Sequence, residues 1–192
     1  METLRLFIAI ELPPEVKQAL ARLQTKLKTG RDTPVKWVAT DAMHLTLQFL
    51  GDVDAGLTGK INAALEIAAR GTSPFRLELT GLGVFPGTAR VRVVWVGLGG
   101  QVDELLNLQK CIETALVHLG FTPESRPFTA HLTLGRVRDN ATPSERQALG
   151  QLIEKTAFKD APGFDVKNVR LVQSQLRPQG PVYTLLASVE LM

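Results

Sequence analysis

The chain has few of the residues that build disulfide frameworks or membrane spans. Only one of its 192 residues, Cys111, is a cysteine, which excludes an internal disulfide and fits a reducing compartment. No apolar run reaches the ~18 residues that a bilayer span needs. The apolar stretch 4–10 is short and is followed at once by Glu11 and Pro13, unlike a secretory signal. We therefore expect a cytoplasmic protein that does not contact membranes.

A strong charge of one sign is also lacking. The net charge is +3 and the isoelectric point lies near 9.2, which suits an anionic substrate but not a protein that coats nucleic acid. The sequence contains neither a Gly-x-Ser-x-Gly motif nor a glycine-rich phosphate loop. The stretch from Gly97 to Gly100 is expected to form a turn between a strand and a helix. Nothing therefore supports a serine nucleophile or a P-loop.

Histidine is scarce, yet two of the three histidines lie in identical tetrapeptides, His44 to Leu47 and His131 to Leu134. Strand side chains alternate between two faces, so a strand at each copy places its histidine and threonine on one face and its leucines on the other. In the first copy, alternation also places Gln48 with the polar side chains and Phe49 with the core-facing leucines. A structural requirement rarely selects the same two polar residues twice, so we interpret both copies as functional.

Two imidazoles and two hydroxyls suit acid/base chemistry on a phosphate. Histidine has an unperturbed pKa of ~6.5, so one neutral and one protonated imidazole can act as base and acid. Thr46 and Thr133 lie about 6.5 to 7 Å further along the same strand faces, where a hydroxyl can donate to a non-bridging phosphate oxygen. We expect His44, Thr46, His131 and Thr133 to converge on one cleft, with the imidazoles on the order of 5 to 8 Å apart.

A metal centre is the competing chemical interpretation. Zinc takes three or four histidine, cysteine or carboxylate ligands. Asp41 and Asp52 are close to His44 in the sequence, but the first acidic residue after His131 is Asp139. The sequence therefore predicts a site without a metal or any other cofactor.

Arginine is the next candidate for binding phosphate, because its planar guanidinium matches two phosphate oxygens. Strict alternation places Arg136 on the leucine face, so a bulge at Gly135 is needed to turn it toward the threonine; otherwise it is a surface arginine at the strand end. Arg90 and Arg92, expected on one face of a strand, either line the same cleft or are solvated. The third histidine, His118, ends a predicted helix and is expected to be structural.

The order of predicted elements indicates an α+β fold with mostly antiparallel sheets. Each motif strand follows one helix and precedes another, so the halves resemble a diverged duplication, and no linker divides them. We predict a single bilobal domain over residues 1–192, with two pseudo-symmetric lobes, helices outside and a central cleft that carries both motif strands. The predicted strands cover 4–12, 44–50, 75–82, 90–98, 130–137, 164–176 and 182–191, and residues 36–38 are expected to form a short extended piece. The predicted helices run from Pro14 to a stop at Gly30, from Ile61 to a stop at Gly71, from Leu105 to a stop at Gly120, and from Pro143 to about Thr156.

Five stretches then carry a family resemblance that extends over nearly the whole chain. They are Arg5–Ala9 with Pro13, Met43–Gly51, Phe85-Pro86 with Arg92–Gly97, Phe128–Arg136, and Gly180–Tyr183. In this order they resemble the bacterial and archaeal RNA 2′,3′-cyclic phosphodiesterases, also called the 2′-5′ RNA ligase family, within the two-histidine (2H) phosphoesterase superfamily. One departure is Ala130, at a position that is often proline in the family.

The resemblance implies metal-free hydrolysis of RNA 2′,3′-cyclic phosphate ends, or of small nucleotide cyclic phosphates, to 2′-phosphomonoesters. It implies His44 as proton donor, His131 as proton acceptor, Thr46 and Thr133 as phosphate-holding hydroxyls, and Arg136 as a substrate-binding residue. We expect a monomer. Two alternatives stay open: the reverse reaction, which joins a cyclic end to a 5′-hydroxyl, and an RNA-binding module that retains the motifs without turnover.

Overall fold

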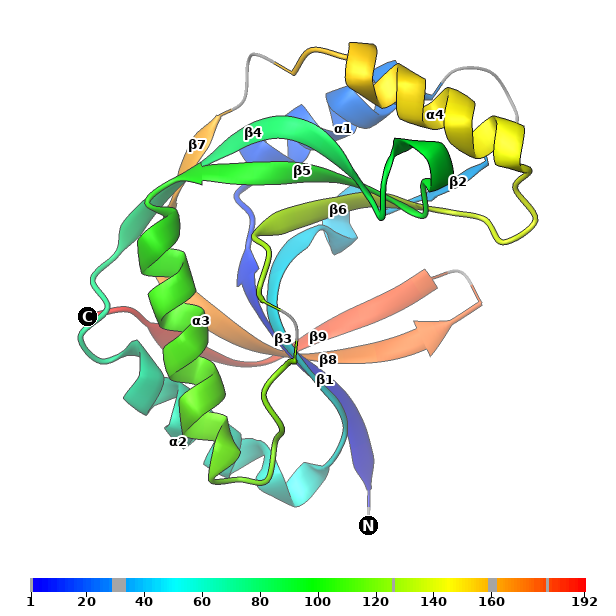
Figure 1. Cartoon of the computed structure of the whole chain (residues 1–192). Helices are drawn as coiled ribbons and strands as arrows, with labels where there is room; N and C mark the ends of the chain where they lie inside the picture. The colour runs from blue at the N-terminus through cyan, green and yellow to red at the C-terminus, as the bar shows by residue number, and fades with distance from the viewer. Residues whose placement is uncertain (1, 29–33, 126, 159–161, 179) are drawn as a thin grey trace.

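Two antiparallel β-sheets build the structure, a computed structural model that describes residues 2–28, 34–125, 127–158, 162–178 and 180–192. Within these residues sheet A has the strand order β3-β1-β8-β9, and sheet B has the order β2-β6-β5-β4-β7. The sheets lie one above the other in Figure 1, with the helices on their outer sides, which confirms the predicted α+β fold. The strands of sheet A are β1 (Thr3–Glu11), β3 (His44–Asp54), β8 (Asn168–Arg177) and β9 (Gly180–Glu190). Those of sheet B are β2 (Val35–Trp37), β4 (Phe75–Phe85), β5 (Val93–Gly100), β6 (His131–Val137) and β7 (Gly163–Val166).

The helices cover the sheets in two pairs. α1 (Pro14–Leu27) and α4 (Pro143–Lys155) lie over sheet B, and α2 (Thr58–Ala69) and α3 (Val102–Val117) pack together beside sheet A (Figure 1). α1 and α4 each begin with a proline, whose missing N–H needs no partner in the first turn. Short 3₁₀ turns precede β3, α2 and β5: η1 (Thr40–Ala42), η2 (Ala55–Leu57) and η3 (Thr88–Arg90). No helix in the described ranges is both long and apolar enough to span a bilayer.

The predicted helices are confirmed to within a few residues at their ends, except that the stop at Gly30 lies outside the described residues. Gly71 and Gly120 follow α2 and α3 with φ of 81° and 87°, the left-handed conformation that ends a helix. These two glycines therefore predicted the ends of α2 and α3 correctly.

Gly100, the last residue of β5, has a φ of 80°. The turn predicted over Gly97–Gly100 is wrong, because Leu98, Gly99 and Gly100 pair with β4 as strand residues.

Two strand predictions are wrong in detail. The run 164–176 is not one strand, because the chain leaves sheet B after Val166 and enters sheet A at Asn168. Apolar residues alternate at Phe164 and Val166 and then, shifted by one position, from Val169 onward. This shift in the alternation marks the crossing between the sheets in the sequence. The strand expected from residue 90 begins at Val93, because Arg90 belongs to η3.

The motif strands are anchored by the leucines of the repeated tetrapeptide. Leu45, Leu47, Leu132 and Leu134 are at most 3 % exposed, and all belong to the hydrophobic core. Burying a leucine side chain contributes on the order of 2 kcal/mol. This anchorage leaves the opposite face of each motif strand free for the polar residues. We call these opposite faces of sheets A and B the motif faces.

Candidate active site

His44 and His131 occupy the same place in their strands. Each is the first residue of its strand, β3 or β6, and each is half-buried. β3 belongs to sheet A and β6 to sheet B, yet Cα atoms of the two strands come within 8 Å of each other. The fold therefore brings together two strands that are far apart in the sequence.

The two imidazoles make the same hydrogen bond. Nδ1 of His44 lies 2.9 Å from the carbonyl oxygen of Ala42, and Nδ1 of His131 lies 2.7 Å from that of Thr129. A carbonyl oxygen only accepts, so Nδ1 carries the proton and donates it in both bonds. Nε2 is then the nitrogen that remains to accept or release a proton. In both strands, therefore, the carbonyl of the residue two positions earlier orients the candidate catalytic imidazole.

Aromatic rings hold His44 in place. The Phe7 ring stacks on the imidazole at a centroid distance of 4.6 Å, and the Tyr183 ring meets it edge-on at 5.1 Å. Phe7 and Tyr183 also contact each other, with centroids 5.2 Å apart. Two rings, from β1 and β9, therefore restrict the orientation of this imidazole, as a catalytic group requires.

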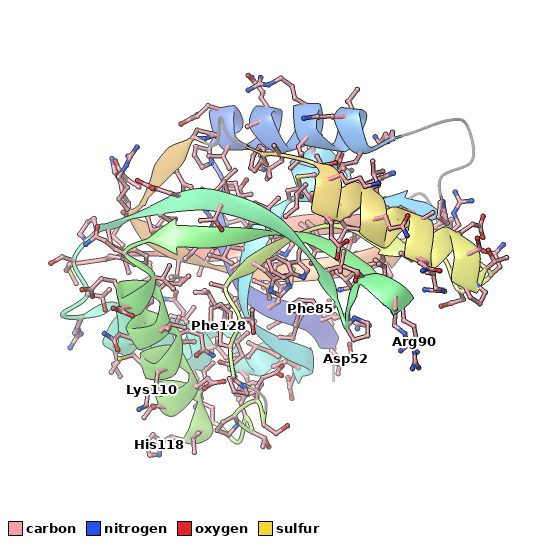
Figure 2. All side chains as sticks on the ribbon, turned by 45° about the horizontal axis from the view of Figure 1, so that its top comes forward. Asp52, Phe85, Arg90, Lys110, His118 and Phe128 are labelled. Carbon is pink, nitrogen blue, oxygen red and sulfur yellow. The ribbon has the colours of Figure 1, made fainter. Side chains whose placement is uncertain are left out.

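His131 has an equivalent pair of aromatic neighbours in sheet B. The Phe85 ring lies edge-on to the imidazole at 5.2 Å and that of Trp95 lies at 6.2 Å. Phe85, labelled in Figure 2, comes from β4 and lies on the same side of sheet B as His131. The family resemblance includes Tyr183 and Phe85, but only the tertiary structure shows that they contact the histidines.

Burial lowers the pKa of His44 below its ordinary value of 6.5. The Ala42 carbonyl and the Glu11 carboxylate act in the opposite direction and raise this pKa, whereas Lys17 lowers it. The Glu11 carboxylate also pairs with Lys17 and, at 3.3 Å, with the guanidinium of Arg170. The imidazolium form of His44 is therefore more acidic than a solvated one, and the neighbouring charges adjust how acidic it is.

A β-bulge follows the first motif threonine. Consecutive residues of β1 pair with Thr46 and Gln48 of β3, so Leu47 is the extra residue. A bulge reverses the alternation beyond it. Gln48 is consequently buried at 4 % exposure, and Phe49 is 64 % exposed. The prediction that Phe49 faces the core and Gln48 the polar face is wrong for this reason.

The same bulge follows the second motif threonine. Consecutive residues of β5 pair with Thr133 and Gly135 of β6, so Leu134 is the extra residue. Beyond it, Arg136 lies on the same face as Thr133 and is exposed. The bulge that Arg136 requires is thus present, one residue before its predicted position. Gly135 has its own reason to be glycine, because a Cβ there would lie 2.5 Å from Cγ1 of Val35.

The other polar candidates are exposed and occupy no strand. His118 caps the end of α3, and its side chain points away from the molecule in Figure 2. Arg90 is exposed in η3, at the tip of the connection between β4 and β5 (Figure 2), and Arg92 is exposed just before β5. A structural role for His118 at a helix end agrees with this position.

A hollow of about 210 Å³ adjoins His44 on the motif face of sheet A. Phe7, Tyr183 and Leu185 give it apolar walls, and Arg170 lines it with a cationic group. His131 does not line this hollow, so the hollow lies on the sheet A side of His44. Among the residues that the structure describes, no three His, Cys, Asp or Glu side chains are grouped closely enough to hold a metal ion.

The sequence profile of the LigT-like phosphoesterases matches the chain twice, over residues 10–95 and again over residues 96–183. The chain belongs to this family of enzymes. Each matched segment contains one motif strand, β3 in the first and β6 in the second. The double match agrees with the duplication predicted from the repeated tetrapeptide.

Relatives and solved structures give the same assignment. The RNA 2′,3′-cyclic phosphodiesterase of Methanothermobacter thermautotrophicus is 36 % identical over 180 residues, which cover 94 % of this chain and 95 % of the relative. That of Aeropyrum pernix is 37 % identical over 172 residues, 89 % of this chain and 94 % of the relative. A crystal structure of a Thermus thermophilus protein superposes with a TM-score of 0.80 at 30 % identity over 97 % of each chain. Escherichia coli LigT complexed with 3′-AMP gives 0.76 at 27 % identity over 100 % of this chain and 99 % of LigT.

Proposed function

We propose that this LigT-like phosphoesterase hydrolyses RNA 2′,3′-cyclic phosphate ends to 2′-phosphomonoesters, without a metal ion. The observation that carries the proposal is the matched pair of imidazoles, each with Nδ1 bound to the carbonyl two residues earlier and Nε2 left for chemistry. Relatives with the name RNA 2′,3′-cyclic phosphodiesterase and the nucleotide complex of E. coli LigT support the substrate class.

In the proposed mechanism the cyclic phosphate lies between the two motif faces. Nε2 of His131 takes a proton from a water molecule, whose oxygen attacks phosphorus. The bond from phosphorus to O3′ breaks on the opposite side, and the imidazolium of His44 gives its Nε2 proton to O3′. The products are a 2′-phosphate and a 3′-hydroxyl. Because burial lowers the pKa of His44, its imidazolium gives up a proton more readily, and the negative phosphate helps to keep the imidazolium charged until then.

The remaining motif residues bind the phosphate in this proposal. Thr46 and Thr133 lie on the motif faces two residues after the histidines, where their hydroxyls donate to the non-bridging oxygens. The bulge that turns Arg136 onto the same face supplies a guanidinium for the charge that grows in the transition state. Each of these groups strengthens its interaction as charge moves onto oxygen, which is the condition for accelerating the reaction.

Ligation remains the second enzymatic candidate. A 5′-hydroxyl of a second RNA would attack the cyclic phosphate in place of water, and the same histidines would keep their roles: His131 would take the hydroxyl proton and His44 would protonate O3′. A binding module without turnover is the third candidate. The His-Thr pair on each motif face, together with Arg136 on the motif face of sheet B, argues against it.

One experiment separates the three candidates. A short RNA with a 2′,3′-cyclic phosphate end is incubated with the protein in EDTA, with and without an excess of a 5′-hydroxyl RNA, and the products are resolved by phosphorus NMR. The proposal expects a 2′-phosphomonoester in EDTA. A 2′-5′ linked product as the main species would favour ligation. Binding without any product would favour the binding module, and activity that requires an added divalent ion would overturn the metal-free mechanism.

A further inference from the structure

Arg170 lies on the motif face of sheet A, in the same row as the first motif threonine. Ala9 of β1 pairs with Thr46 of β3 on one side and with Arg170 of β8 on the other. Directly opposed residues share a face, so all three side chains project from the motif face. Ala9 has no side chain beyond Cβ and is 2 % exposed. No long side chain therefore stands between Thr46 and Arg170 in this row.

The protein itself uses only part of the Arg170 guanidinium. Nη1 of Arg170 lies 3.3 Å from Oε2 of Glu11. Nε of Arg170 is buried, and within the described part of the chain it has no hydrogen-bond partner. The side chain as a whole is 32 % exposed, so a ligand can reach it. A guanidinium carries five N–H donors, and one that is held by a single carboxylate can bind a further anion.

Arg170 faces the hollow of about 210 Å³ that adjoins His44. Among the described residues that line this hollow, it is the only arginine or lysine. Two carboxylates also line it, but Asp41 is exposed to solvent and Glu11 is paired with Lys17 as well as with Arg170. In the cluster of Glu11, Lys17 and Arg170, the two cations outnumber the single carboxylate. The hollow therefore favours an anionic group beside the candidate proton donor.

The orientation of the substrate in the proposed mechanism indicates which anionic group this is. His44 protonates O3′, so the terminal ribose lies on the sheet A side of the phosphorus, which is also the side of the hollow. In a nucleoside 2′,3′-cyclic phosphate this ribose ends in a 5′-hydroxyl. In an RNA chain its 5′ oxygen carries a phosphodiester, which is negatively charged and lies one nucleotide away from the reacting phosphate.

We propose that Arg170 binds the phosphodiester on the 5′ side of the terminal nucleotide, so that the protein prefers an RNA end to a mononucleotide. This inference rests on the proposed function, because it uses the same orientation of the substrate. Glu11 keeps its ion pair with Lys17, and the donors of Arg170 that Glu11 does not use bind the phosphate oxygens. The contact is independent of base sequence, since every nucleotide carries the same phosphate.

The test varies the charge on both partners. One substrate is a dinucleotide that ends in a 2′,3′-cyclic phosphate, and the other is the same dinucleotide with an uncharged methylphosphonate in place of the internal phosphodiester. We expect the unsubstituted protein to prefer the charged linkage by about 10-fold or more in kcat/KM, mainly through KM, the scale of a hydrogen bond to a charged group. Arg170→Met keeps much of the apolar stem and removes the guanidinium, so its kcat/KM should be the same for both substrates. Arg170→Gln provides a second neutral variant, and Arg170→Lys should keep part of the preference.

Two features of the design isolate this contact. A change at Arg170 also alters the charges around His44, but that effect is common to both substrates and cancels in the ratio of their kcat/KM values. Arg76→Met is the matched control, because it too removes an arginine that is paired with a carboxylate, that of Asp165, and it changes the net charge equally. Arg76 and Phe85 lie at opposite ends of β4, so the control is remote from the site. It should keep the preference of the unsubstituted protein.

The outcomes distinguish this inference from the proposed function. If the unsubstituted protein hydrolyses both substrates with equal kcat/KM, the inference is wrong and the proposed function stands. If Arg170→Met and Arg170→Gln keep the full preference for the charged linkage, another group binds the phosphodiester, which also overturns the inference. If the unsubstituted protein hydrolyses neither substrate, the proposed function fails first and the inference fails with it.

Discussion

Glu11 lies directly opposite His44 in the register of β1 and β3, and its carboxylate raises the pKa of the imidazole. The same carboxylate is shared with Lys17 of α1 and Arg170 of β8. Lys17 acts on His44 in the opposite sense and lowers its pKa. Burial is the largest influence on the proton affinity of the candidate donor, and a charge cluster that contains no motif residue adjusts it.

Substitutions in this cluster should move the pH profile in opposite directions. In the proposed mechanism His44 must be charged, so its deprotonation gives the alkaline limb of kcat/KM. Glu11→Gln removes a raising influence and leaves Lys17 unpaired, so we expect the alkaline limb to move to lower pH. Lys17→Met removes a lowering influence and should move the same limb to higher pH. NMR titration of the His44 imidazole in both variants checks the assignment; shifts of the same sign would contradict it.

Removal of either motif histidine should slow turnover severely. We expect His44→Ala and His131→Ala each to lower kcat by ~10² to 10⁴, the usual scale for losing a general acid or base. The double variant should lose far less than the product of the two effects, because the two groups act in one step. Single-turnover rates on a nucleoside cyclic phosphate measure all three. Independent, multiplying losses would mean that the histidines serve separate steps.

The donor and acceptor roles can be separated with the leaving group. A substrate whose leaving oxygen is far more acidic than a ribose hydroxyl needs no proton from His44. On such a substrate His44→Ala should recover most of its lost activity, and His131→Ala should not. Equal sensitivity of both variants would refute this assignment of roles while leaving the two-histidine site intact.

The planar geometry of the Arg136 guanidinium should contribute to phosphate binding. We expect Arg136→Ala to lower kcat/KM by about 10- to 150-fold, the scale of a hydrogen bond to a charged group. Arg136→Lys should restore only part of this loss, because an ammonium cannot bind two oxygens in one plane. Arg70→Ala, at the exposed end of α2, is the control and should have no effect. Full recovery with lysine would show that charge alone is sufficient.

Two helical glycines should respond to alanine with opposite signs. A Cβ on Gly150 of α4 would lie 2.2 Å from the carbonyl oxygen of Thr88 in η3, so Gly150→Ala must displace one of these elements. We expect it to lower the free energy of unfolding by ~1–3 kcal/mol. Gly59 of α2 has no neighbouring atom within 4 Å of an added Cβ, and Gly59→Ala should raise that free energy by ~0.4–1 kcal/mol. Urea unfolding of both variants provides the measurement, and a loss of stability in Gly59→Ala would count against the helical packing described here.

Local signals in the sequence were sufficient for most of the helices and strands and for the motif. Proline and glycine mark the ends of α2, α3 and α4, and the repeated tetrapeptide identifies both histidines and both threonines without any structure. These features depend on neighbours in the chain, which a sequence displays directly. The α+β order and the antiparallel pairing follow from the same short-range patterns.

Strand pairing in the folded protein decided which face of its sheet each residue beyond a bulge occupies. Alternation alone gives Phe49 to the core and Gln48 to the motif face, and the extra residue at Leu47 reverses both. A bulge exists only relative to the partner strand, so no pattern within β3 reveals it. The same applies to Arg136, whose side chain reaches the motif face only because β5 pairs around Leu134.

The contacts around the imidazoles also depend on the fold. The sequence by itself determined that two histidines and two threonines were present in a duplicated pattern, with an arginine after the second copy. Only the tertiary structure decided that Phe7 and Tyr183 would contact His44 and that Glu11 would lie opposite it, because these residues arrive from β1 and β9. Orientation and proton affinity are properties of an environment, and three-dimensional packing creates that environment from residues that are distant in the chain.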